Sequence, residues 1–160
     1  MPSNRSTTTP GRGIPGGAVL TIWGVVNLVN LLQAIGFATR VSNWDLQRIV
    51  GIMIAVLAVP ATLALVSFVR RGVGWRFYSG PLMFDAFVVL LVVVEYVLAI
   101  EWRSPGRPEV LVPLVSLFFG SIILMGAPML RINRRLWAMT AVTTTVLLSA
   151  MLYAMSKGVG

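Results

Sequence analysis

The sequence contains no histidine and no cysteine in its 160 residues. These residues supply the imidazole and thiolate groups of zinc, haem and iron–sulfur sites, and the nucleophiles or bases of Cys and Ser-His catalytic systems. Their absence excludes those metal sites and those forms of catalysis. The eight methionines do not replace them, because methionines scattered through apolar segments usually fill packing gaps. We therefore expect no metal and no cofactor.

Two further enzyme signatures are missing. The glycines between Gly11 and Gly17 precede a long apolar segment instead of following a strand, and they lack the spacing of a phosphate-binding loop. Asp85 and Glu95 lie ten residues apart, which is about 15 Å along a helix and too far for the paired carboxylates of a hydrolase. We predict that the protein is not an enzyme.

Charged residues are also scarce. Only 11% of the residues are charged, whereas about a quarter of an ordinary globular chain is, and the mean hydropathy is +0.86. A hydrocarbon core about 30 Å thick is crossed by about 20 apolar residues in a helix, because lipid cannot pair an open backbone. The composition therefore predicts an all-α, polytopic integral membrane helical bundle. Five apolar stretches have the necessary length: 18–38, 49–69, 82–100, 110–130 and 136–156.

The predicted spans form a single transmembrane domain over residues 18–156. Only Arg131 to Arg135 separates the last two spans, so four transmembrane helices is the alternative to five. Residues 1–17 are rich in proline, glycine, serine and threonine and cannot bury apolar surface, so we expect a flexible cytoplasmic leader. Residues 157–160 form a short tail.

The basic residues predict the orientation of the bundle. With five spans, eight of the thirteen Lys and Arg residues fall on the side of the N-terminus, and this excess predicts a cytoplasmic N-terminus. No basic soluble domain is present, so we expect the net charge of +8 to attract anionic membrane lipids and not nucleic acid. Arginine outnumbers lysine twelve to one, which is typical of a GC-rich bacterial genome and favours a bacterial cytoplasmic membrane.

Arginine and tryptophan side chains gather near the predicted span ends on the cytoplasmic side. Guanidinium groups bind phosphates while their stems lie along apolar surface, and tryptophan rings prefer the headgroup region. The segment from Arg70 to Pro81, which we expect to be a loop, carries several of them. The residues that we expect at lipid headgroups are Arg70, Arg71, Trp75, Arg76, Arg131, Arg134 and Arg135.

Glu95 lies about four residues, or about 6 Å, from the middle of the predicted third span. An acid near a helix centre costs about 3 kcal/mol on insertion, so its carboxyl needs a protein partner or a proton. Asn27, Asn30 and Gln33 recur every three residues and share one face of the first span. We predict that these amides hydrogen-bond a protonated Glu95, or one another across a helix interface.

Two secondary polar groups accompany this stripe. Thr140 and Thr144 lie on one arc of the last span, although threonines often bond their own helix backbone. Asp85 follows a helix start that we expect at residues 79–81, where an acid complements the helix dipole. There its carboxylate can reach Arg76 or the arginine pair that precedes it.

Three functions are compatible with these features. The small size, short loops and small-residue packing faces favour a non-catalytic accessory or assembly subunit of a larger membrane complex, or a homo-oligomer. The alternative is a proton- or cation-coupled carrier or channel in which Glu95 titrates, whereas in the first function Glu95 is a structural polar lock. A third hypothesis, favoured only by the arginine-rich segment, is a lipid-handling membrane protein.

Overall fold

The computed structural model describes residues 14–40, 44–100 and 107–158. The predicted leader 1–17 therefore lies outside the described residues up to position 13, and the tail beyond position 158. The helices are α1 (Gly16–Arg40), α2 (Trp44–Val56), α3 (Ala58–Arg70), α4 (Trp75–Val92), the π-helical turn η1 (Val93–Val97), α5 (Pro108–Gly126), α6 (Met129–Ile132) and α7 (Arg134–Ser156).

Within these ranges five helical segments are long and apolar enough to cross a membrane, which confirms an all-α polytopic bundle and the prediction of five spans over four. The last two are separate because α6 ends at Asn133, whose side chain accepts a hydrogen bond of 2.9 Å from the backbone N–H of Arg135 and caps α7. The segments are Gly16–Arg40, Leu46–Arg70, Trp75–Val97, Pro108–Ile132 and Arg134–Ser156. The chain is an integral membrane protein.

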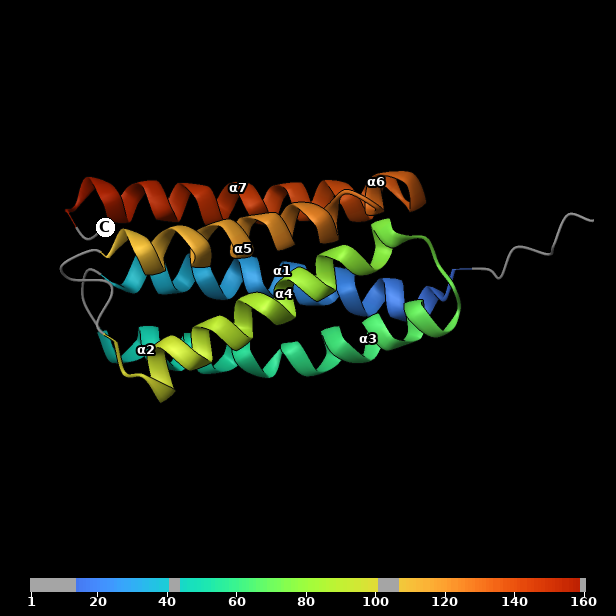
Figure 1. Ribbon diagram of the computed structural model, residues 1–160. Helices are drawn as coiled ribbons and strands as arrows, with labels where there is room; N and C mark the ends of the chain where they lie inside the picture. Colours follow the sequence, from blue (N-terminus) through green and yellow to red (C-terminus); the bar gives the residue numbers. More distant parts are fainter. Residues whose placement is uncertain (1–13, 41–43, 101–106, 159–160) are drawn as a thin grey trace, which may run out of the picture.

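The spans pack as a bundle in which the first helix is a neighbour of the last. The most extensive contacts join α1 with α7 and α4 with α5, while α2 and α3 pack against the opposite side of α1. Figure 1 shows α7 lying along the bundle and α4 crossing it obliquely, in contact with both α3 and α5. This order leaves α1 and α4 with few direct contacts, which decides where their polar side chains find partners.

The second span is broken near its middle. Leu57 separates α2 from α3, and its backbone N–H is shared between the carbonyls of Met53 and Ile54 at 3.2 and 3.1 Å. Pro60 follows one turn later and cannot donate to the carbonyl of Val56. The donor that Pro60 lacks accounts for the irregular turn at this point of the span. Just beyond the end of the span at Arg70, Gly72 has a positive φ of 65°, which lets Val73 donate back to Phe68 at 3.1 Å.

The third span differs from the prediction at its start. We expected a loop up to Pro81, but α4 begins at Trp75 and carries Pro81 inside the helix. Proline is common in the first turn of a helix because it lacks an N–H donor, and this preference predicts a helix start at residues 79–81. Tertiary packing overrides that signal: Phe77 packs on Phe68 of α3 with ring centroids 6.0 Å apart, and Gly80 lies directly against the α5 backbone.

Gly80 gives the first testable prediction. A Cβ at this position would lie 2.6 Å from the backbone N of Met125 and 2.8 Å from the carbonyl carbon of Leu124, so alanine forces α4 and α5 apart. We expect Gly80→Ala to cost about 1 to 3 kcal/mol and to lower the melting temperature in detergent. Gly24→Ala is the matched control, because a Cβ there meets nothing within 4 Å. Equal stability of the two variants would contradict the close approach.

Candidate functional site

The amides of the first span form a polar seam with the threonines of the last. The Asn27 amide N–H group donates to the Thr140 hydroxyl at 3.2 Å and to the carbonyl of Trp23 in its own helix. Its Oδ1 accepts a hydrogen bond of 2.8 Å from the Thr143 hydroxyl. Asn30, which is fully buried, donates to Thr143 at 3.1 Å and to Thr144 at 3.0 Å. The stripe therefore faces α7.

Trp23 extends this seam toward the start of α7. Its indole N–H donates at 3.0 Å to the carbonyl of Leu136 in the first turn of α7, and the same carbonyl accepts from the Thr140 hydroxyl at 3.1 Å. A tryptophan inside an apolar span carries no signal for this role in the sequence. Together the seam residues hold α1 and α7 side by side through hydrogen bonds between their side chains and to the backbone of α7.

The predicted partnership with Glu95 is wrong for the asparagines. Among the described residues, no hydrogen bond joins Glu95 to Asn27, Asn30 or Gln33. The physical reason is the order of the bundle, since α1 packs on α7 and on α2–α3 but hardly on α4. The second option that the sequence left open, hydrogen bonds between the amides themselves, does not occur either, because Asn27 and Asn30 bond the threonines of α7 instead.

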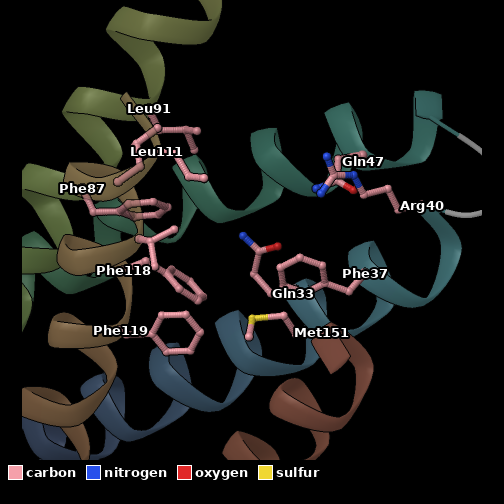
Figure 2. Close-up of a pocket in the computed structure, with 12 residues that line it drawn as sticks. Gln33, Phe37, Arg40, Gln47, Phe87, Leu91, Leu111, Phe118, Phe119 and Met151 are labelled. Carbon is pink, nitrogen blue, oxygen red and sulfur yellow. The ribbon is translucent and has the colours of Figure 1, made fainter. Parts of the chain in front are cut away.

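Gln33 leaves the seam and enters a cavity between α1, α2, α4, α5 and α7. The cavity measures about 190 Å³. Figure 2 shows Gln33 extending between Phe37 and Met151 on one side and the phenylalanines of α4 and α5 on the other. Its apolar wall is formed by Phe37, Phe87, Leu91, Leu111, Leu114, Val115, Phe118, Phe119 and Met151.

Two further polar side chains line the same cavity. Arg40 is the last residue of α1 and is only 9% exposed, and Gln47 comes from the first half of α2. The Oε1 atom of Gln47 is buried and has no hydrogen-bond partner. A buried acceptor without a donor costs about 1 to 3 kcal/mol, so the cavity presents an unmet hydrogen-bonding capacity beside an apolar wall.

Sequence reasoning missed Arg40 and Gln47 as site residues. Both stand next to a predicted turn, and polar residues at span ends are normally placed in the headgroup region. Only the closeness of α1 and α2 to the far helices α5 and α7 reveals that these side chains share a cavity with Gln33. A long cationic side chain in the last turn of an apolar helix was the one available signal, because it complements the helix dipole wherever it points.

The structure places Asp85 closer to the middle of the third span than Glu95, which reverses the order that the sequence predicted. The third span runs Trp75–Val97, so its middle is residue 86. Asp85 lies one residue, about 1.5 Å, from that middle, whereas Glu95 lies nine residues away in the π-helical turn near the span end. The shift follows from the early start of α4 and from Ala99, whose φ of 48° ends the helix before residue 100.

Asp85 has a different partner from the one predicted. Its Oδ2 lies 3.0 Å from the hydroxyl of Thr62 on α3, and its Oδ1 is buried without a hydrogen-bond partner. Arg76 lies nine residues, or about 13 Å, earlier in the same helix, and its guanidinium is placed over the Trp75 ring at 6.0 Å. The expected helix start at residues 79–81 would have brought acid and arginine within reach.

The seven predicted headgroup residues come together at one end of the bundle. They lie at the end of α3, at the start of α4, in α6 and at the start of α7, and all seven are exposed. Arg76 and Arg131 line a hollow of about 410 Å³ with Trp75 and apolar residues of α5 and α6. The end opposite this one holds the cavity with Arg40 and Gln47.

The seam provides the second testable prediction. Thr143→Val removes the hydroxyl that bonds both Asn27 and Asn30, and we expect it to destabilise the protein by about 1 kcal/mol, at about 0.6 kcal/mol for each lost contact in a membrane. Thr145→Val is the matched control, because Thr145 is exposed and donates only to Ala141 of its own helix. Unfolding of both variants by a denaturing detergent measures the difference. A Thr143→Val protein as stable as the control would contradict the seam.

The interior thus holds three separate polar groups: the seam, the cavity and the Asp85–Thr62 pair. Each is built from side chains of neighbouring helices, and none contains the nucleophile-and-base pairing of an enzyme site among the described residues. A function must therefore be inferred from what these groups can bind. Comparison with known proteins finds no matching family model, no similar curated protein and no similar solved structure.

Proposed function

We propose that this protein is a non-catalytic, lipid-handling membrane protein that binds an amphiphile in the cavity lined by Gln33, Arg40 and Gln47. The observation that carries the proposal is the composition of the cavity, a wall of apolar side chains facing three polar ones. Small-molecule sites usually combine a mostly apolar lining with a few polar groups that orient the ligand. In a membrane protein, molecules with both characters are the lipids themselves.

The volume sets the size of the bound group. Pockets for drug-sized ligands measure roughly 300 to 1,000 Å³, and an apolar cavity of roughly 150 Å³ holds one benzene ring. A cavity of about 190 Å³ therefore accepts a ring or a short length of one acyl chain, and not a whole phospholipid. The remainder of the ligand must extend past Leu111 and Val115, which are 38% and 42% exposed at the rim.

The polar side chains set the chemistry of the head. Gln47 Oε1 needs a hydrogen-bond donor, while the amide N–H groups of Gln33 and Gln47 and the guanidinium of Arg40 are groups that can donate to a ligand. A hydroxyl beside an ester carbonyl provides both. We therefore propose a single-chain glycerolipid as the ligand class, with its glycerol head between α1 and α2 and its chain among the phenylalanines.

The opposite end of the bundle supports a second contact with lipid. Arg76 and Arg131 come from different helices and border one hollow whose floor is apolar. Guanidinium groups in this setting favour a phosphate over water, so we propose that anionic phospholipids gather there. This contact would hold the protein at a fixed depth while the cavity exchanges its ligand with the bilayer.

Assembly with other subunits or with itself remains the proposal for how the protein works in the membrane. Small faces that suit helix association, such as Gly51 on α2 and Ser116 on α5, are compatible with it. Purification from the native membrane in a mild detergent tests this proposal separately from ligand binding. Co-purifying subunits or a stable oligomer would support it, and a lone monomer would contradict it.

Filling the cavity tests the proposed ligand. We expect a photoreactive monoacylglycerol in phospholipid vesicles to label the wild-type protein on α4 or α5, and Val115→Trp to weaken this binding about tenfold, or about 1.4 kcal/mol, because the indole occupies the rim. Val112→Trp on another face of α5 is the matched control, since Val112 is 60% exposed and does not line the cavity. Equal labelling of the two variants would sink the proposal.

A substitution at Gln47 tests the binding of the lipid head separately from the binding of its acyl chain. Gln47→Met keeps the side-chain length and removes the unpaired acceptor, so we expect the ligand-free protein to gain about 1 kcal/mol of stability while monoacylglycerol binding weakens. Thermal unfolding with and without the lipid measures both effects. Weaker binding without the gain in stability would mean that the Oε1 atom already has a partner in the ligand-free protein.

A further inference from the structure

The contact between Thr62 and Asp85 contains one hydrogen too few. The Thr62 hydroxyl lies 2.8 Å from the carbonyl of Ala58 in its own helix and 3.0 Å from Oδ2 of Asp85. A hydroxyl has a single hydrogen and both neighbours are acceptors if Asp85 is ionised. Either one of the two short contacts holds no full hydrogen bond, or Asp85 brings a hydrogen of its own.

The surroundings decide against an ionised carboxylate. The other oxygen, Oδ1, is buried without a partner, so a carboxylate here would have at most a shared fraction of one hydrogen bond. Asp85 is partly exposed, Thr62 is exposed, and both lie in the spans, so this exposed side faces acyl chains and not water. A charge left so poorly solvated in hydrocarbon is far costlier than a neutral acid.

Among the side chains that the structure describes, no cation on the neighbouring helices offsets such a charge. On α4 itself the titratable side chains nearest to Asp85 are seven or more residues away, and those of the helices packed against it stand near the ends of the spans. They are Arg76 and Tyr78 on α4, Glu95 and Tyr96 on η1, Arg48 on α2, Arg70 on α3, and Glu109 on α5. The middle of the α3–α4 contact therefore contains one titratable group and no charge to balance it.

From these contacts we infer that Asp85 is a proton-binding site at the middle of the membrane, a neutral carboxylic acid whose O–H donates to Thr62. Thr62 in turn donates to Ala58, so the hydrogens form a chain from the acid of α4 to the backbone of α3. Asp85 Oδ2 then carries the proton and donates it to Thr62. Only Oδ1, which is a neutral carbonyl oxygen in the protonated acid, remains without a partner. This site is separate from the cavity and independent of the proposed ligand.

The position of Thr62 links the proton to a movement. The break at Leu57 and the proline at position 60 lie within about one and a half turns of it, so α3 begins at a weak point of the second span. Loss of the proton would place an unbalanced charge between α3 and α4 and favour their separation at this level.

Infrared spectroscopy of the protein in lipid vesicles tests the protonation directly. We expect the carbonyl stretching band of a neutral carboxylic acid at pH 7, lost in Asp85→Asn and retained in Glu95→Gln. Thr62→Val should shift the band, because the acid loses its acceptor, and Thr62→Ser should leave it in place. A wild-type spectrum at pH 7 with carboxylate bands and no band from a neutral acid would overturn the inference.

Reaction with dicyclohexylcarbodiimide gives an independent readout in the wild-type chain. This reagent reaches acids from the lipid phase: the carboxyl oxygen bonds to its central carbon, the acid proton moves to its nitrogen, and rearrangement leaves a stable N-acylurea. We expect peptide mass spectrometry to find the adduct on Asp85, with labelling that declines at high pH. An adduct found only on Glu95, or no adduct under conditions that label a known membrane acid, would overturn the inference even if Asp85→Asn fails to fold.

Discussion

The structure depends on one constraint, which is that a polar group inside the bilayer must find its partner within the protein. Asn27 and Asn30 meet this constraint through the threonines of α7, and they thereby decide which helices are neighbours. Apolar side chains cannot decide this, because lipid is as apolar as a valine and offers little preference between partners. A few hydrogen bonds thus select one arrangement of helices that are apolar on every face.

The same constraint separates the interior into regions with different chemistry. In the seam both donors of the Asn27 and Asn30 amides are engaged and one buried oxygen, Asn30 Oδ1, has no partner, so its role is to hold α1 against α7. In the cavity the Gln47 Oε1 atom has no donor, which is why we propose that a hydrogen-bonding ligand binds there. At the α3–α4 contact the missing hydrogen is supplied by a proton. In each case the number of donors and acceptors, more than the identity of the residues, indicates the role.

The class of the fold could be predicted from the sequence because length and hydropathy alone define membrane spans. The partners of the polar residues could not. The sequence predicts that one helical face carries Asn27, Asn30 and Gln33, but the partners of this face depend on which helix packs against it. The two ends of the stripe in fact reach different sites, since Asn27 bonds α7 and Gln33 lines the cavity. Pro81 predicts a helix start just before Asp85, but the packing of Phe77 and Gly80 outweighs this local signal and the helix begins earlier. The predicted depths of Asp85 and Glu95 in the membrane are wrong for the same reason.

The pairing of α1 with α7 has a consequence for how the chain is made. Synthesis delivers the first helix to the membrane long before the last, and the threonines that bond Asn27 and Asn30 follow about 113 residues later. During that interval the two amides lack the threonine partners that α7 provides. A chain that ends before α7 would therefore carry both amides into the membrane without the hydroxyl groups that they bond in the complete bundle.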